Sequence, residues 1–250
     1  MHIFRVLIAF AAIVPALAHA GRLADVEVYD RTDRRALSVY EHEGRLYVAG
    51  EPHHQYELRI RSRTAARLLA VTSVDGVNVI TGETASQQQS GYVIGGWDAV
   101  TVEGWRKSLD DVATFYFTRL ENSYAARTGR PNDVGVIGIA LFREREYCCM
   151  EGYDKRAPAA QANEDASAPQ SAAGSAARRE SQLGTGHGHR ESSPARYVDF
   201  RRASQTPDET LVIYYDSHRN LVAQGVLPQG PELAEQRRPT PFPAGFVPDP

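Results

Sequence analysis

The nine residues from Val134 to Phe142 carry no polar side chain, and this run limits the fold more than any other part of the sequence. An unbroken apolar stretch of this length is typical of a strand that is buried on both faces. We therefore expect Val136, Ile137, Ile139 and Leu141 to lie on a central strand of a sheet.

Most of the chain between Gly21 and about Arg145 alternates between apolar and polar residues, which indicates strands with one buried and one wet face. The clearest alternating sets are Val26 and Val28, then Leu37, Val39, Leu46 and Val48, and then Tyr56, Leu58 and Ile60. Glu43-Gly44 and Asp75-Gly76 each stand between two such runs. Turns of this kind predict β-hairpins.

The segment from Ser108 to Phe117 leaves two interpretations open. Ser108 suits a helix N-cap, and Asp110 and Asp111 suit a first helical turn. Residues 114–118, however, are aromatic and β-branched, as strands prefer. A short helix that runs into a strand and a strand throughout both fit this pattern.

Composition changes sharply beyond the apolar run. Residues 151–194 are rich in Ala, Ser, Gln, Gly and Arg and nearly lack large apolar side chains. Such a stretch buries too little apolar surface to offset the entropy of ordering, so we expect a disordered loop from Glu151 to Pro194 that proteases cut first. Seven of the 23 residues over 228–250 are proline, which predicts a disordered tail.

Ordered structure is expected again from Arg196, with Leu211–Tyr215 and Leu221–Leu227 as the last strands. The stretch from Arg196 to Leu227 has only 32 residues, and a unit of fewer than roughly 40 rarely folds alone. We therefore predict a single, mostly β domain over residues 21–227 that the loop interrupts. Short, regularly spaced strands favour an antiparallel β-sandwich, an open barrel is the alternative, and one short helix is allowed.

Residues 1–20 have the three-part layout of a secretory signal peptide. Arg5 makes the start positive, residues 6–18 are apolar or small, and Ala18-His19-Ala20 places small residues where a signal peptidase reads. The apolar stretch is shorter than the roughly 20 residues that span a bilayer. We expect cleavage after Ala20 and a periplasmic or secreted protein without an integral membrane span.

Charge and cysteine content exclude several classes of protein. Lys and Arg number 28 against 31 Asp and Glu, and the two signs are mixed along the chain. A basic surface for nucleic acid is therefore not expected. Two cysteines are too few for a disulfide scaffold or a four-cysteine zinc module.

Cys148 and Cys149 are neighbours in the sequence. Adjacent cysteines close a disulfide only through a distorted ring. A strained bridge, a cross-link between two molecules and two free thiols all remain open, so both residues are candidate disulfide or thiol sites.

His187 and His189, separated by one glycine, are the candidate ligands for copper or zinc. A metal site needs a third or fourth ligand that is fixed on a scaffold. The expected loop offers none, so we predict a solvated pair, no bound metal and no cofactor. His53 and His54 follow Pro52 in a predicted turn, where exposure accounts for them.

Catalytic motifs are absent from the sequence. It contains no G-x-S-x-G, no H-E-x-x-H, no phosphate-binding G-x-x-x-x-G-K-[ST] and no dinucleotide fingerprint. Asp75, Asn78 and Glu83 lack the spacing of a calcium loop. Trp97 and Trp105 could form an aromatic binding strip, although core packing explains them more simply. No catalytic or cofactor-binding residue is therefore assigned, and whether the protein is an enzyme stays open.

Three segments resemble a family of uncharacterised secreted proteobacterial proteins that are rich in β structure. They are Arg67–Ala85 (RLLAVTSVDGVNVITGETA), Ser90–Val93 (SGYV) and Gly104–Ser108 (GWRKS). The resemblance implies a secreted β-rich protein and no particular activity.

These features together predict a secreted or periplasmic β-domain with a binding or structural role in the cell envelope. Its partner would be an envelope protein or a glycan. An envelope hydrolase with an unrecognised active site and a copper- or zinc-binding periplasmic protein are the alternatives. A pocket with convergent carboxylates of shifted pKa would favour the enzyme, whereas an aromatic strip or a free sheet edge would favour binding.

Overall fold

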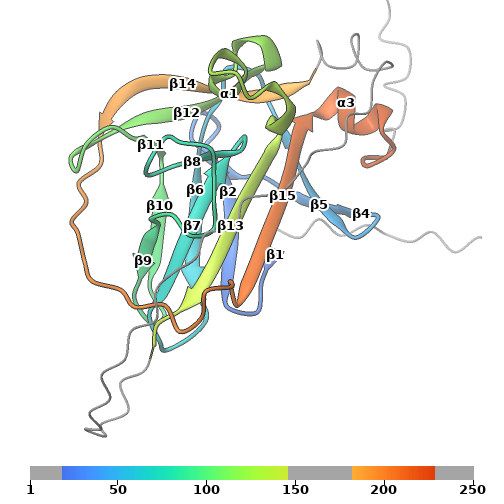
Figure 1. Cartoon of the computed structure of the whole chain (residues 1–250). Coiled ribbons are helices and arrows are strands. Elements are labelled where there is room, and N and C mark those ends of the chain that lie inside the picture. Colours follow the sequence, from blue (N-terminus) through green and yellow to red (C-terminus); the bar gives the residue numbers. More distant parts are fainter. Residues whose placement is uncertain (1–18, 146–181, 229–250) are drawn as a thin grey trace, which may run out of the picture.

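The computed structural model describes residues 19–145 and 182–228, which form two β-sheets (Figure 1). The first sheet has the strand order β1-β2-β6-β12-β11, with β3, β10 and β14 paired to β2, β6 and β12 respectively. Its strands are β1 (His19–Ala20), β2 (Ala24–Asp30), β3 (Arg35–Ala36), β6 (Gln55–Ser62), β10 (Ala99–Val102), β11 (Gly104–Arg106), β12 (Asp111–Arg119) and β14 (Leu183–Ser192).

The second sheet has the order β4-β5-β15-β13-β7-β8, with β9 paired to β7. Its strands are β4 (Val39–His42), β5 (Arg45–Gly50), β7 (Leu68–Val74), β8 (Val77–Asn78), β9 (Tyr92–Ile94), β13 (Val136–Arg143) and β15 (Glu209–Ser217). The helical segments are η1 (Leu120–Asn122), α1 (Tyr124–Arg127), η2 (Pro131–Asp133) and α3 (His218–Ala223). None of the helices in the described part is long and apolar enough to cross a membrane.

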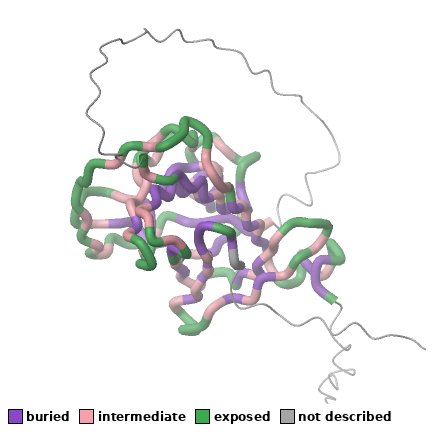
Figure 2. Tube along the Cα trace, turned by 90° about the horizontal axis from the view of Figure 1, so that it is seen from below, coloured by how far each residue is buried: buried purple, intermediate pink, exposed green. Residues whose placement is uncertain are grey.

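The two sheets face each other and share one apolar core. The ring of Tyr215 on β15 lies 6.4 Å from that of Tyr56 on β6 and 5.5 Å from that of Phe117 on β12, measured between centroids. A single cluster of buried apolar side chains draws on both sheets, and Figure 2 shows buried residues inside and exposed residues in the connecting loops. The mostly β, sandwich-like class is confirmed.

The predicted central strand is β13, which lies between β7 and β15. Ile137, Ile139 and Leu141 point into the shared core. Ala140 and Phe142 lie on the opposite face, in a second cluster that includes Phe200. Because apolar side chains cover both faces, the strand needs no polar residue, which is why its sequence does not alternate.

Both predicted hairpins are present. Glu43 and Gly44 join β4 to β5, and Asp75 and Gly76 join β7 to β8; all four residues have φ between +50° and +71°. That conformation suits a two-residue hairpin turn. One pair of strands departs from the expected antiparallel arrangement, since β15 pairs with β5 in parallel.

The start of β12 settles the two interpretations of residues 108–117 in favour of the strand. Ser108 Oγ accepts hydrogen bonds from the backbone N–H groups of Asp110 and Asp111, as an N-cap would, but residues 107–110 form bends and no helix follows. The strand then begins at Asp111. The aromatic and β-branched residues of this segment dominate its local structure, as their propensities favour.

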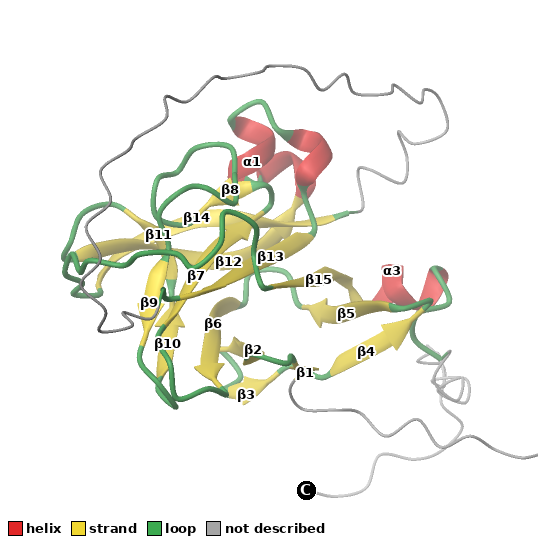
Figure 3. Ribbon diagram, turned by 60° about the horizontal axis from the view of Figure 1, so that its bottom comes forward, coloured by secondary structure: helices red, strands yellow, loops and turns green. Residues whose placement is uncertain are grey.

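The disordered loop expected over residues 151–194 is wrong for residues 183–192, which form β14 beside β12 (Figure 3). This strand pairs with β12 along its whole length, and its glycines let the backbone lie close to residues of β12. A Cβ on Gly186 would lie 2.1 Å from the Tyr116 ring, and one on Gly188 would lie 2.3 Å from Thr114 Oγ1. Glycine favours disorder in a chain without contacts, but here the absence of a Cβ lets β14 lie close to β12. Residues 151–181 of the expected loop lie outside the described residues, as do the signal segment before residue 19 and the tail from residue 229.

The end of the described chain also differs from expectation. Tyr197 is 88% exposed and residues 193–200 form no strand. The predicted strand over 221–227 is wrong, because residues 221–223 belong to α3 and residues 224–227 form a turn and a bend. The Ser217 side chain accepts a hydrogen bond from the N–H of Asn220 and caps this helix.

Candidate functional site

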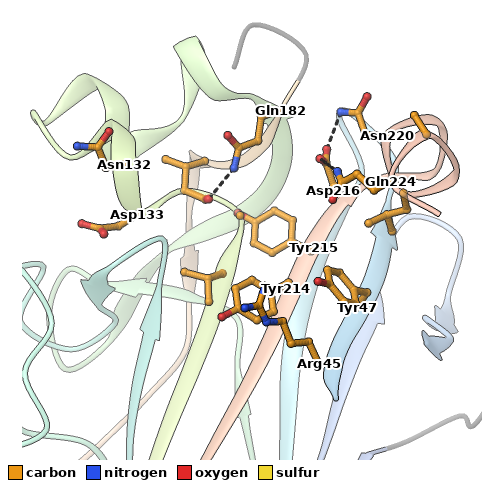
Figure 4. Close-up of a pocket in the computed structure, with 15 residues that line it drawn as sticks. Arg45, Tyr47, Asn132, Asp133, Gln182, Tyr214, Tyr215, Asp216, Asn220 and Gln224 are labelled. Carbon is orange, nitrogen blue, oxygen red and sulfur yellow. Dashed lines mark hydrogen bonds between the residues drawn. The ribbon is translucent and has the colours of Figure 1, made fainter. Parts of the chain in front are cut away.

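A polar cleft of about 850 Å³ opens at the end of the sandwich where β15 runs into α3 (Figure 4). We call it the Tyr214 cleft. Its lining residues are Arg45, Tyr47, Asn132, Asp133, Val134, Gly135, Val136, Gln182, Tyr214, Tyr215, Asp216, Asn220, Leu221, Ala223 and Gln224. Helix α3 supplies one side of the cleft and η2 with the segment before β14 supplies the other, as Figure 4 shows.

Two tyrosines form the floor of the cleft. The parallel register of β5 and β15 sets Tyr47 beside Tyr214, and their ring centroids are 5.6 Å apart at an interplanar angle of 33°. The Arg45 guanidinium carbon lies 5.7 Å from the centroid of the Tyr214 ring, within reach of a cation–π interaction. Because side chains alternate along a strand, the next residue, Tyr215, points into the core.

Asp216 stands at the α3 side of the cleft and is tied to the fold by four donors. Its Oδ1 accepts from the backbone N–H groups of Leu183 and Ser217 and from Asn220 Nδ2, at 3.1, 2.7 and 2.8 Å. Its Oδ2 accepts from Gln224 Nε2 at 3.2 Å. Burial raises the pKa of Asp216, and these hydrogen bonds offset part of the rise.

A fully buried network stands behind the cleft. Asp75 Oδ1 accepts from the Tyr215 hydroxyl at 2.5 Å and from the N–H of Gly135 at 2.9 Å. Asp75 Oδ2 accepts from the N–H of Thr185 at 2.8 Å. Thr185 Oγ1 lies 2.6 Å from the hydroxyls of both Tyr215 and Tyr56. These bonds join both sheets and fix Gly135 and Tyr215 in the cleft wall.

Burial raises the pKa of Asp75 to about 6, and the hydrogen bonds from Tyr215, Thr185 and Gly135 limit the rise. The same burial, with the nearby Asp75 charge, raises the pKa of Tyr56 and of Tyr215 well above the ordinary value. Both tyrosines therefore keep their protons and remain donors to the network.

Four side chains of the cleft are available to a ligand. Within the part of the chain that the structure describes, the side chains of Tyr47, Tyr214, Asn132 and Asp133 make no hydrogen bond. The cleft thus offers two aromatic faces, an amide, a carboxylate and a guanidinium to a polar molecule.

His187 and His189, the predicted metal candidates, are now on β14 and have different neighbours. The His187 ring lies 6.3 Å from Trp105 at an angle of 9° and 5.4 Å from Tyr124, and burial lowers its pKa. His189 Nδ1 lies 3.4 Å from Gln55 Nε2. Among residues 19–145 and 182–228, no group of three metal-ligating side chains includes either histidine.

The remaining candidates from the sequence are the two cysteines and the two tryptophans. Cys148 and Cys149 lie outside the described residues. Trp105 is 2% exposed in the core, whereas Trp97 is 65% exposed on the turn between β9 and β10. The two tryptophans therefore do not share one exposed aromatic strip.

Sequence analysis did not predict two features of the structure. The tyrosines of the cleft belong to no motif, and only the adjacent pair Tyr214-Tyr215 on a predicted strand hinted that one aromatic ring would face outward. Exposure does not account for His54, because its side chain is 22% exposed and its Nδ1 lies 2.8 Å from Asp30 Oδ2.

Comparison of the chain with protein-family models, curated proteins and solved structures finds no match. Function is therefore inferred from geometry and chemistry.

Proposed function

We propose that this protein is an exported binding module of the cell envelope whose Tyr214 cleft holds a glycan. The observation that carries the proposal is the half-buried Tyr47–Tyr214 pair in the cleft, bordered by Asn132 and Asp133, whose side chains make no hydrogen bond within the described residues. Sugar rings present C–H faces that pack on aromatic rings and hydroxyls that pair with amides, carboxylates and guanidinium groups. The cleft provides each of these.

The state of the two carboxylates with raised pKa supports binding over hydrolysis. A general acid or base must come within hydrogen-bond reach of the substrate. Asp75 is fully buried behind the cleft, and the oxygens of Asp216 are occupied by four donors of the protein. Both groups hold the wall of the cleft in place, and a preorganised wall lowers the entropic cost of binding.

Export is the second part of the proposal and rests on the signal-like layout of residues 1–20. β1 precedes the expected cleavage point and is a two-residue strand that pairs only with β2. A mature chain that begins at Gly21 therefore keeps every other strand pair of the sandwich.

Titration calorimetry against soluble envelope oligosaccharides, with peptidoglycan fragments among them, tests the glycan assignment. The Tyr214→Ala variant removes one aromatic face, and we expect the affinity to fall about two- to tenfold, since loss of a stacking contact costs about 0.5–1.5 kcal/mol. Tyr197→Ala is the matched control, because that tyrosine is 88% exposed and lies outside the cleft. Equal affinities for both variants, or no binding to any oligosaccharide, would show that the cleft does not serve glycans.

A further inference from the structure

Three metal-ligating side chains meet on the first sheet, and none of them lines the Tyr214 cleft. Asp30, Asp33 and His54 bring one ligand atom each within 4.8 Å of one another. His54 Nδ1 lies 2.8 Å from Asp30 Oδ2 and 3.9 Å from Asp33 Oδ1. Asp30 ends β2 and Asp33 lies in the turn that follows, whereas His54 lies directly before β6, 24 positions after Asp30.

The turn after β2 fixes both carboxylates. Asp30 Oδ1 accepts hydrogen bonds from the N–H groups of Thr32 and Asp33, each at 2.9 Å. This turn holds the Asp30 side chain and leaves Oδ2 facing His54. Asp33 Oδ2 pairs with Arg35 Nε at 3.2 Å, which leaves Asp33 Oδ1 as the atom on the His54 side.

The backbone around His54 is equally constrained. The carbonyl of His54 accepts from the N–H of Phe117 at 2.9 Å, and the N–H of His53 donates to the carbonyl of Phe117 at 2.7 Å. Two bonds to β12 thus set the position of this turn. A ligand set on fixed backbone binds an ion without a large ordering cost.

A bound cation would stabilise the buried carboxylate of Asp30. Its side chain is 1% exposed, and within the described residues its ion-pair partner is His54 alone, with no lysine or arginine. A buried carboxylate is costly unless a positive charge compensates it. Asp33 and His54 are 41% and 22% exposed, so an ion from solvent can reach the site.

We propose that Asp30, Asp33 and His54 bind a divalent transition-metal ion, with zinc as the type case. One imidazole nitrogen with carboxylate oxygens is a set that zinc accepts, whereas calcium takes oxygen ligands alone. The metal replaces the hydrogen shared by His54 Nδ1 and Asp30 Oδ2 and lies to one side of the line that joins them, because two bonds of about 2.0–2.2 Å do not fit end to end within 2.8 Å. The Nδ1 proton is released to solvent, His54 stays protonated on Nε2, and water completes the coordination.

Zinc chloride added to the purified, tag-free chain tests this site. Cys148→Ser and Cys149→Ser are introduced first, because thiolates also bind zinc. Titration calorimetry should give one ion per chain. The melting temperature should rise by about 5–10 °C at a hundredfold excess of zinc over Kd.

Two variants of the proposed ligands and one control variant at the neighbouring His53 make the test specific. His54→Asn keeps an N–H toward Asp30 and removes the ring ligand, so the zinc-dependent rise should disappear. His53→Asn is the matched control: His53 has φ +72°, which asparagine tolerates, and this variant should keep the full rise. Asp33→Asn leaves the Asp30–His54 pair intact and should weaken binding at least about tenfold, by loss of roughly 1.4 kcal/mol or more.

Any of three other outcomes would refute the proposed metal site. Zinc without effect on the parent chain, zinc binding retained in His54→Asn, or binding lost in His187→Ala in place of His54→Asn would each do so. If His54→Asn does not fold, Asp33→Asn decides, because its half-exposed side chain can change without unfolding the turn. Unchanged affinity in that variant would refute the proposal.

Discussion

Replacing Asp75 with asparagine removes one charge and one acceptor from the network behind the Tyr214 cleft. In the native protein Oδ1 serves Tyr215 and Gly135, and Oδ2 serves Thr185. An amide has one oxygen, so in either orientation its NH₂ group faces a backbone N–H that cannot turn away. A buried donor left without an acceptor costs about 1–3 kcal/mol, and we expect Asp75→Asn to lose stability of that order.

Protonation of Asp75 removes the same charge without this conflict. The carboxyl proton can be donated to the Tyr215 oxygen, Tyr215 can donate to Thr185 Oγ1 at 2.6 Å, and both backbone N–H groups keep acceptors. Since burial raises the pKa from 3.8 to about 6, the folded protein binds this proton more tightly than the unfolded chain. The resulting stability is full below pH 3.8 and is lost as the pH rises through about 6.

The two effects together predict a pH-dependent difference between the proteins. From pH 7 to pH 5 the native protein gains about 1 kcal/mol from Asp75 and the asparagine variant gains none from that position. The destabilisation caused by Asp75→Asn should therefore be about 1 kcal/mol larger at pH 5 than at pH 7. Other groups titrate alike in both proteins and cancel in the comparison.

Urea denaturation followed by tryptophan fluorescence at the two pH values measures this difference. Asp110→Asn, at an exposed position, is the control and should show the same stability as the native protein at both. A destabilisation by Asp75→Asn that is equal at pH 5 and pH 7, or a variant more stable than the native protein at pH 5, would refute the reasoning.

Three further changes test other parts of the structure. Ile137→Asp places a charge at a site that is 1% exposed and should cost at least about 3 kcal/mol, seen as loss of soluble protein or a much lower melting temperature; a variant that melts like the native protein would contradict the position of β13. Gly188→Ala puts a Cβ 2.7 Å from the carbonyl oxygen of Thr114 and should cost about 1–3 kcal/mol by calorimetry, while an unchanged melting temperature would argue against the tight β12–β14 contact. Mass spectrometry of the exported protein should find Gly21 at its start, and an intact Met1 would disprove cleavage.

The parts of the fold that the sequence predicted are those set by short-range pattern. The apolar residues around Ile139 could only be a strand covered on both sides, and Asp75-Gly76 could hardly be anything but a tight turn. Both signals act through neighbours in the chain: side-chain alternation, and the φ values that a two-residue turn demands.

The sequence did not predict β14, because the stability of this strand comes from residues far away in the sequence. Gly186 and Gly188 contribute no apolar surface, and their value appears only when β12 lies against them. Thr185 is held by Asp75, 110 positions earlier. The contact between His54 and Asp30 was not predicted for the same reason, since the two residues are 24 positions apart and meet only in the folded chain.

The place of β15 in the second sheet has a consequence for how the chain reaches its final form. β15 lies between β5 and β13, pairing Tyr215 with Val48 on one side and Leu211 with Ile139 on the other. During synthesis from the N-terminus, β5 and β13 each lack this neighbour until β15, the last strand of the described residues, has been made. Pairings so distant in sequence form slowly, so we expect closure of the second sheet to be a late step of folding. The second sheet is therefore complete only when nearly all of the described residues have been made, and β15 is the strand that joins its two parts.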